Sequence, residues 1–561
     1  MKKWVQLALL AVFLCAAAIR IYPLFQYELW GSDTGEYYYI TDQLASDGYV
    51  STDYDGWGFA YPNFPGMYYI AGAAHLVLGI DLLLALIFVI PIVSALSVLI
   101  TFFLGKMMFR NDGAALLASA IVAIAFPHVF ATSHPMPGSF GDVLLLFSLL
   151  LLLASIKNRK FLIPLTLTGL ALTVSHHLSA YFLFIMVLGA VFVTEILRKE
   201  EKGEAKWYWL FLVFFLTIQV LFWTVGAPDF TERVISSAFN VPLVALFGAG
   251  YLAIGMAYII VKIRKKLKWS YVPRFPGFRM QAIKGWALVV ALSVVLIYVT
   301  NVSVLGTDID LPPETPFLFA PFILLTSLAA MGPDYVKFFR HGPALVGWMI
   351  AVLVSAFLGI MTTSHVLLPY RHVQYMVPPM ALLGGFGFVM FATSGIEKKF
   401  SKRMFGVITV VIVLALAAAM AYPPKEVLGG FQEGTSHEDM QAVYWARESL
   451  PEDITVASDH RMSSMIFGFG RLNATWDSAQ KTLHAPSYAE CRDEIEGLDT
   501  PSGEKPIDYI LLDNDIKEGA ALLQWENARP MSQEAQDKFE RAPFIKLYEA
   551  GGVEIYGLAA E

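Results

Sequence analysis

The sequence predicts a polytopic α-helical membrane protein that carries an extracytoplasmic α/β domain at its C-terminal end. First, 56% of the 561 residues are hydrophobic and 16% are charged, whereas soluble globular chains are about 45–50% apolar and about 25% charged. Second, long apolar runs alternate with short basic loops as far as residue 421. Third, residues 422–561 change to mixed helix-like and strand-like patterns.

The N-terminal segment predicts a first membrane span that is retained in the mature protein. It reads MKKWVQLALLAVFLCAAAIRIY, with a basic end and an apolar centre, as a secretory signal would. Its apolar run continues to Tyr22, however, which is long enough to cross a bilayer. We therefore interpret it as a transmembrane helix.

Basic loops predict the orientation of the chain, because short cytoplasmic loops collect Lys and Arg. Placing every basic loop inside leaves room for an outward and a return helix between successive loops. This gives about thirteen spans, with a cytoplasmic N-terminus and an extracytoplasmic C-terminus in a multi-pass protein of the cell membrane. The inside loops are residues 1–3, 105–112, 157–160, 197–206, 262–279, 336–342 and 397–403, and the outside connections are 23–80, 131–141, 174–178, 226–238, 301–315, 362–373 and the tail after 421.

The first outer loop, residues 23–80, contains an apolar segment that is too short for an ordinary span. Counting residues 66–80 as a span would invert every later loop and move the basic runs outside. Tyr68 and Tyr69 open the segment, and aromatic residues favour the membrane interface. We expect a helix that lies at the outer interface.

The tail predicts a soluble domain of ordinary size, residues 422–561, after a transmembrane domain of residues 1–421. The stretches ITVAS (454–458) and YILLD (509–513) are typical of buried strands. Residues 436–450 predict an amphipathic helix capped by Ser436.

Composition also excludes some classes. A formal net charge of −7 gives no reason to expect a nucleic-acid partner. Cys15 lies in the first apolar run and Cys491 in the tail, so no disulfide framework is expected.

Carboxylates gather in the outer loops, where charge near a bilayer usually serves a purpose. Asp33 follows the first span, Asp142 closes the stretch SHPMPGSFGD, and Glu314 lies with Asp308 and Asp310 in GTDIDLPPETP. If these loops converge, the carboxylates have the chemistry to hold Mg²⁺ or Mn²⁺. Such an ion stabilises negative charge on a departing phosphate, and a carboxylate can orient or deprotonate an acceptor. The alternative is that these acids are solvated surface.

Other polar residues at the outer side are candidates for substrate binding. Arg371, followed by His372, suits phosphate recognition, although an interfacial anchor explains it equally well. His176 and His177 lie between two spans without a third ligand at a metal-site spacing, so we expect them near the active cavity rather than on a metal. Tyr38, close to Asp33, completes this set of candidates.

In this order the landmarks resemble the GT-C membrane glycosyltransferases, and among them the catalytic subunit of oligosaccharyltransferases. The acidic first outer loop leads into WGFAYPNFPGMYY, the second family motif is matched by PHVFATSHPMPGSFGDV, the acidic loop by PPETP, and the late arginine by PYRHVQYMVPP. The resemblance implies a catalytic metal at Asp33, Asp142 and Glu314, and donor phosphate at Arg371. The family's acceptor motif WWDYG is not found, and DHRMSSMIFGFGRLNATWD (459–477) stands in its place.

The resemblance implies transfer of a sugar or oligosaccharide from a polyprenyl (dolichyl) phosphate or pyrophosphate to a protein, lipid or glycan acceptor at the outer membrane face. A close alternative uses a polyprenyl monophosphate donor and acts on a lipid or surface polymer. A transporter or flippase without chemistry is a third possibility, but it predicts internal repeats and charges at mid-membrane depth. Membrane lipids are expected partners in each case, and the sequence specifies no oligomeric state.

Overall fold

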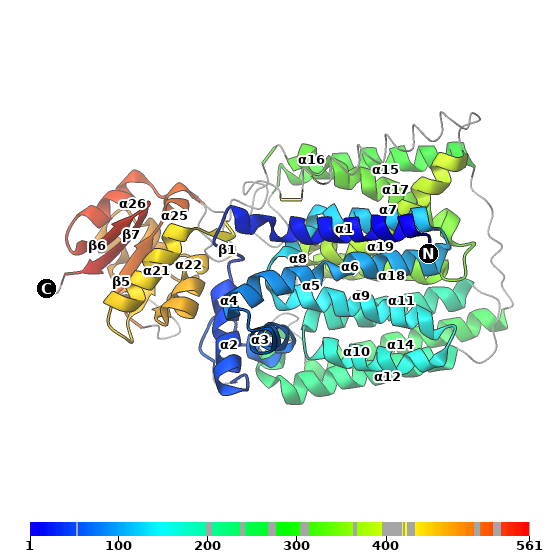
Figure 1. Ribbon diagram of the computed structural model, residues 1–561, viewed down its shortest axis with the longest axis horizontal. Coiled ribbons are helices and arrows are strands. Elements are labelled where there is room, and N and C mark those ends of the chain that lie inside the picture. Colours follow the sequence, from blue (N-terminus) through cyan, green and yellow to red (C-terminus); the bar gives the residue numbers. More distant parts are fainter. Residues whose placement is uncertain are drawn as a thin grey trace.

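The computed structural model describes residues 1–51, 54–197, 205–235, 242–267, 277–302, 312–313, 315–362, 367, 369–394, 418, 421–422, 432–498, 505–519 and 529–559. A long bundle of helices carries a small α/β domain at one end, and the N-terminus lies at the opposite end of the bundle (Figure 1).

Within the described residues, eight helices are long and apolar enough to cross a membrane, or nine if a bent pair forms one span. The predicted multi-pass α-helical architecture is therefore confirmed. Further predicted spans correspond to α10 (Leu162–Thr173), α15 (Phe278–Val299) and α17 (Ala320–Val336), while residues 404–417 lie outside the described part. The other long helices of the bundle are α1 (Lys3–Ile21), α6 (Leu96–Phe109), α7 (Asp112–Ile124), α9 (Pro137–Ser155), α11 (His177–Leu197), α12 (Ala205–Leu221), α14 (Leu243–Lys266), α18 (Gly342–Thr362) and α19 (Pro369–Ser394).

Helices α11 and α18 pack closely because glycines face each other where they cross. A Cβ atom on Gly189 would lie 2.3 Å from the carbonyl oxygen of Gly347, and a Cβ on Gly347 would lie 2.1 Å from that of Gly189. Small residues at such crossings bring backbones together, which is how helices associate in a membrane without a hydrophobic driving force.

The bent pair consists of α7 and α8 (Phe126–Ser133), whose axes differ by 57°. Pro127 explains the break, because it lacks a backbone N–H and its ring would clash with the carbonyl of Ala123 in a continuous helix. The break turns α8 so that its polar residues face α1 and α9.

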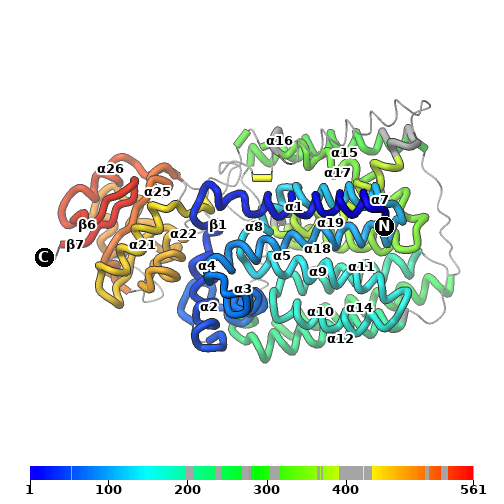
Figure 2. The backbone as a smooth tube through the Cα atoms, viewed as in Figure 1, coloured from blue at the N-terminus to red at the C-terminus, as the bar shows by residue number. Residues whose placement is uncertain are grey.

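The first outer loop folds between the bundle and the soluble domain (Figure 2). It contains a short strand β1 (Leu29–Trp30), then α2 (Thr34–Asp47) and α3 (Gly66–Leu78). Figure 1 shows α3 nearly end-on, whereas the spans run across the view. Its exposed apolar side chains are Tyr69, Leu76, Val77 and Leu78, an arrangement that suits a helix at the membrane interface.

The soluble domain is built on a five-stranded sheet in the order β4-β3-β5-β7-β6. Strand β3 pairs parallel with β4 and β5, and β7 pairs antiparallel with β5 and β6. The predicted strands are β3 and β5, and the predicted helix is α21, capped by Ser436, whose side chain accepts a hydrogen bond from the backbone N–H of Asp439. The sheet and its helices are β3 (Thr455–Ala457), β4 (Asn473–Ala474), β5 (Tyr509–Leu512), β6 (Phe544–Ala550), β7 (Val553–Leu558), α21 (His437–Ser449), α22 (His460–Met465), α23 (Gln480–His484), α24 (Tyr488–Ile495), α25 (Asn514–Glu518) and α26 (Gln533–Asp537).

A second, two-stranded sheet joins the first outer loop to the soluble domain. Strand β1 pairs antiparallel with β2 (Gly434–Thr435), so that Leu29 lies opposite Thr435 and Trp30 opposite Gly434. The first outer loop and the beginning of the soluble domain are thus tied together.

Candidate functional site

Asp33 immediately precedes α2, at the N-cap position of that helix. One carboxylate oxygen, Oδ2, accepts hydrogen bonds from the hydroxyls of Tyr61 at 2.8 Å and Tyr37 at 3.2 Å. The other, Oδ1, lies 2.9 Å from Nε2 of His460, in the soluble domain. The side chain of Asp33 is 22% exposed, so it remains within reach of a substrate while protein groups fix its orientation.

His460 is held between two carboxylates. It is the first residue of α22, just beyond the carboxyl end of β3, and its Nδ1 lies 2.9 Å from Oδ1 of Asp477. Asp477 follows β4, the parallel neighbour of β3. Ligand-binding residues of open α/β sheets gather at these carboxyl ends, so the soluble domain presents the edge typical of binding sites to α2.

The two carboxylates determine the charge state of His460. A neutral imidazole has one donor and one acceptor nitrogen, whereas both nitrogens here face carboxylate oxygens. Burial by itself lowers the pKa of His460, but hydrogen bonds and charges from Asp33 and Asp477 outweigh it and raise this pKa well above its ordinary value. For Asp33, burial by itself raises the pKa, but the contacts with His460 and the two tyrosine hydroxyls outweigh it, so that this pKa is lowered.

Glu36, one turn further along α2, is a buried carboxyl, and its pKa is shifted in the opposite direction from that of Asp33. Its Oε1 accepts hydrogen bonds from the hydroxyl of Tyr54 at 2.5 Å and the backbone N–H of Gly58 at 2.8 Å. Its Oε2 has no hydrogen-bond partner among the residues that the structure describes. Burial, together with the charge of Asp33, raises the pKa of Glu36 to about 7.

An exposed indole borders these groups. The Nε1–H of Trp57 donates to Oδ2 of Asp477 at 3.0 Å, and the indole meets the ring of His460 edge-on with centroids 4.7 Å apart. Trp57 is nevertheless 44% exposed. A solvent-facing aromatic surface is therefore fixed beside two carboxylates.

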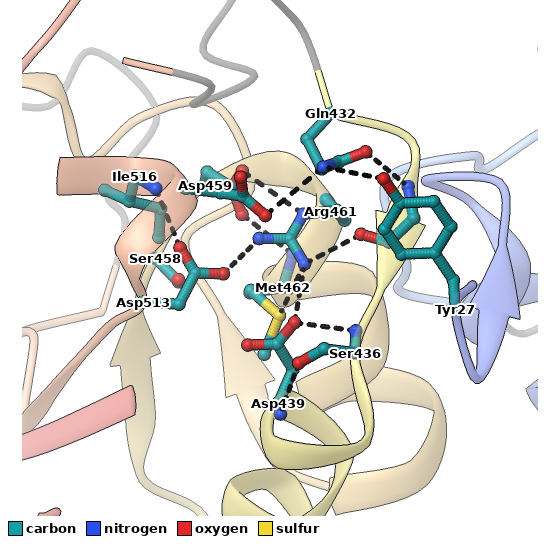
Figure 3. Close-up of polar contacts among 12 residues, drawn as sticks. Tyr27, Gln432, Ser436, Asp439, Ser458, Asp459, Arg461, Met462, Asp513 and Ile516 are labelled. Carbon is teal, nitrogen blue, oxygen red and sulfur yellow. Dashed lines mark hydrogen bonds and ion pairs between the residues drawn. The ribbon is translucent and has the colours of Figure 1, made fainter. Parts of the chain in front are cut away.

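Arg461, the neighbour of His460, anchors the start of α22. Its guanidinium is fully buried and forms ion pairs with Asp513, with Asp439 at 3.2 Å and with Asp459 at 3.9 Å (Figure 3). Burial lowers the pKa of Arg461, but the three carboxylates outweigh it and raise this pKa above its ordinary value. This network holds Arg461, which directly follows His460 in α22.

Helix α2 and the soluble domain also meet backbone to backbone. A Cβ on Gly35 would lie 1.9 Å from the carbonyl oxygen of Ser464, and a Cβ on Gly468 would lie 2.1 Å from that of Gly35. The ring of Tyr38 stacks on Phe469 with centroids 4.3 Å apart. Tyr38, proposed from the sequence as a substrate contact, thus contributes to this seam between the two domains.

Asp142 belongs to a different network, inside the bundle. Its Oδ2 lies 2.9 Å from Nε2 of His128 on α8, and Nδ1 of that ring lies 3.0 Å from a guanidinium nitrogen of Arg20. Arg20 also donates to the hydroxyl of Thr132 at 2.9 Å. The Oδ1 atom of Asp142 has no hydrogen-bond partner within the described part of the chain. This network joins α1, α8 and α9.

The predicted histidines and arginine lie at the N-terminal ends of α11 and α19. Nδ1 of His176 is 2.8 Å from the Ser179 hydroxyl, which in turn lies 2.8 Å from the hydroxyl of Tyr375 on α19. His372 lies 2.8 Å from the hydroxyl of Ser355.

The first outer loop contacts this second group. The ring of Phe64 packs against His177 with centroids 5.2 Å apart, and Phe64 lies three residues beyond Tyr61, which binds Asp33. The surroundings of Asp33 and of Arg371 are therefore connected through a short segment of this loop.

The metal site predicted from the sequence is not assembled in the described part of the chain. There, no group of three or more His, Cys, Asp or Glu side chains is arranged to hold a metal ion. Asp33 and Asp142 belong to separate networks, and both oxygens of Asp33 already accept from protein donors. Glu314, Asp308 and Asp310 lie outside the described residues, so the three-carboxylate site stays a prediction.

Sequence reasoning missed His460, Asp477, Tyr61 and the buried state of Glu36. A signal for His460 was present, since DHR directly follows a predicted strand. No local pattern indicates that this strand end meets a loop more than 400 residues earlier; the separation of His460 and Asp33 is 427 positions.

Comparisons with known proteins identify the fold. No protein-family model matches the chain, and no curated protein matches it. Among solved structures, the Archaeoglobus fulgidus oligosaccharyltransferase, tethered to an acceptor peptide with an NVT sequon, matches with a TM-score of 0.62 at 15% identity, over 100% of this chain and 74% of that one. The mycobacterial arabinofuranosyltransferase AftD matches with a TM-score of 0.50 at 13% identity, over 100% of this chain and 40% of that longer one. The chain therefore has the GT-C fold that the sequence resemblance implies.

Proposed function

Because the chain has the fold of GT-C glycosyltransferases, we propose that it is a membrane glycosyltransferase. In this proposal a sugar or oligosaccharide passes from a polyprenyl-phosphate-linked donor to an acceptor at the membrane face that bears the soluble domain. The observation that carries the proposal is the position of Asp33, a partly exposed carboxylate fixed between the first outer loop and the soluble domain.

The proposed reaction forms a bond between an acceptor heteroatom and the anomeric carbon of the sugar. The bond from that carbon to the phosphate oxygen breaks, and its electron pair remains on the departing phosphate. Asp33 accepts a hydrogen bond from the acceptor and orients it, and the acceptor proton passes through this carboxylate to water. Arg371 and the nearby His176 face the donor phosphate in this assignment, because guanidinium groups match phosphate oxygens in geometry and charge.

We place this chemistry outside the cytoplasm, with the N-terminus inside. Two features support the orientation. The basic loops follow the positive-inside rule, and the N-terminus and the soluble domain lie at opposite ends of the bundle (Figure 1).

The donor class has two candidates. A pyrophosphate carrier corresponds to the oligosaccharyltransferase resemblance and to a catalytic Mg²⁺ or Mn²⁺. A monophosphate carrier is favoured by the engagement of both Asp33 oxygens with protein donors. The acceptor is a protein, lipid or glycan; residues 459–477 replace the family's acceptor motif, which favours an acceptor other than an asparagine sequon.

Transfer from a defined donor tests the proposal. The full chain in lipid nanodiscs is given a polyprenyl monophosphate sugar or a polyprenyl pyrophosphate oligosaccharide, with membrane extract as acceptor source, and release of the carrier phosphate is measured. Asp33→Asn keeps the side-chain shape but removes the negative charge, so we expect release to fall at least 100-fold, as for loss of a catalytic acid–base group (about 10²–10⁴-fold). Asp47→Asn, at the exposed end of the same helix, is the matched control and keeps full activity.

Two results would contradict the proposal. One is carrier release by Asp33→Asn at the rate of the unmodified chain. The other is solute uptake into vesicles without any sugar transfer, which would favour a transporter.

A further inference from the structure

We propose that His460 is the resident cation of Asp33, so that this chain works without a divalent metal ion at that carboxylate. The inference rests on the transfer reaction proposed above, with Asp33 as the residue that orients the acceptor. It departs from the metal that the fold resemblance implies, and it assigns His460 as a positioning residue that acts through Asp33.

The donors around Asp33 carry the first part of the argument. Its Oδ1 faces His460, and its Oδ2 accepts from two tyrosine hydroxyls. Mg²⁺ demands near-ideal octahedral geometry with oxygen ligands at about 2.0–2.1 Å. An ion at this carboxylate competes with these donors for the same oxygen lone pairs and would stand against the ring of His460. The residues present therefore do not fit a metal ion at Asp33 in this arrangement.

The second part is the position of His460 between two acids. Nε2 and Nδ1 each lie 2.9 Å from a carboxylate oxygen, of Asp33 and Asp477 respectively. Both contacts are satisfied as hydrogen bonds only when both nitrogens carry a proton, and the ring is then an imidazolium. The ring is 5% exposed, so its positive charge is little screened by water.

The third part is that the ring is held in place. Arg461, next in sequence, is buried in ion pairs with three aspartates. The backbones of Gly35 and Gly468 meet without room for a Cβ. For an ion to replace His460, the ring must turn away from both carboxylates or helix α22 must separate from α2. The contacts to Asp33 and Asp477 oppose the first movement, and the backbone packing opposes the second. The ring is therefore held where it orients Asp33.

Manganese uptake tests the inference independently of any sugar donor. Purified full-length chain in nanodiscs is titrated with Mn²⁺, and electron paramagnetic resonance of the free ion reports how much is bound. We expect the unmodified chain and Asp33→Asn to bind the same amount. We expect His460→Ala to bind one additional ion per chain, and His460→Ala with Asp33→Asn to lose it, because the vacated carboxylates then provide the site.

His437→Ala is the matched control, since this histidine is exposed in the same domain, and it binds no additional Mn²⁺. His460→Ser, which also removes the ring and vacates both carboxylates, gives a second test if the alanine variant fails to fold. Binding of Mn²⁺ by the unmodified chain that Asp33→Asn abolishes would overturn the inference. So would the absence of additional binding in folded His460→Ala or His460→Ser.

The transfer assay separates failure of this inference from failure of the proposed function. Carrier release by the unmodified chain that persists in excess EDTA agrees with the inference, and release that EDTA abolishes and Mn²⁺ restores overturns it. If no donor is turned over at all, the proposed function fails, while the Mn²⁺ titration still decides what occupies Asp33.

Discussion

The imidazole of His460, at the start of helix α22, lies 2.9 Å from the carboxylate of Asp33, which stands 427 positions earlier in the chain. This contact joins the first outer loop of the membrane domain to the carboxyl edge of the sheet in the soluble domain. The candidate site therefore belongs to neither domain alone, and changes on either side of the seam are expected to affect it.

Removing the charge of Arg461 is expected to destabilise the soluble domain strongly. Arg461→Met leaves three buried carboxylates without their cation, and breaking one side of a buried ion network costs about 3–5 kcal/mol. Thermal unfolding of the purified protein measures the loss. Arg492→Met removes an exposed ion pair with Glu496, which contributes about 0–1 kcal/mol; an equally small effect at Arg461 would contradict a role in anchoring α22.

Adding one methyl group at Gly35 is expected to separate α2 from α22. The new Cβ would lie 1.9 Å from the carbonyl oxygen of Ser464, so the helices must move apart and the Asp33–His460 contact lengthens. We expect Gly35→Ala to lower carrier release at least 10-fold. Gly72→Ala in α3 is the control, because its Cβ would meet Leu44 at an ordinary 3.5 Å; full activity of Gly35→Ala would show that the seam does not position the site.

The raised pKa of Glu36 predicts that the free energy of unfolding depends on pH. Its pKa is raised from 4.5 to about 7 in the folded protein by burial and by the charge of Asp33. Between pH 4.5 and about 7, the folded state binds more protons at Glu36 than the unfolded state does. The contribution of Glu36 to the free energy of unfolding therefore falls as pH rises, and it is lost above about pH 7. The shift corresponds to about 3 kcal/mol.

Chemical unfolding of Glu36→Gln across this pH range tests the prediction. The variant should lose that portion of the pH dependence, whereas Glu438→Gln, on the exposed side of α21, should keep it. A Glu36→Gln variant whose stability changes with pH as in the unmodified chain would show that Glu36 ionises normally.

Trp57 is expected to support the site through its indole N–H. Trp57→Phe keeps an aromatic ring but removes the hydrogen bond to Asp477, which, as a bond to a charged acceptor, is worth about 1.5–3 kcal/mol. We expect carrier release to fall about 10-fold or more, since each 1.4 kcal/mol is a factor of ten. Trp207 is an exposed tryptophan on α12, so Trp207→Phe should not change carrier release. An unchanged rate in Trp57→Phe would show that the hydrogen bond between Trp57 and Asp477 has no part in the mechanism.

The sequence predicted those features that depend on local patterns. The membrane spans, the capped helix after Ser436 and the strands around Thr455 and Tyr509 follow from periodicity, charge and capping residues. These signals lie within windows of about 11–18 residues, and the structure confirms the elements.

The composition of the site depends on contacts that no local window contains. Asp33 was identified as a candidate, but its partner His460 lies in another domain. The sequence places Asp142 near Asp33 as a prediction. The structure adds that the break at Pro127 turns α8 so that His128 pairs with Asp142, a contact that no local pattern indicates.

The most direct test of the account is a double-mutant cycle between Asp33 and His460, with the rate of carrier-phosphate release as the measurement. Residues that act as one unit give strongly non-additive effects. The account predicts that Asp33→Asn combined with His460→Gln is no slower than the slower single variant. Single losses that simply multiply in the double variant would show that the two residues act independently, and would contradict a composite site.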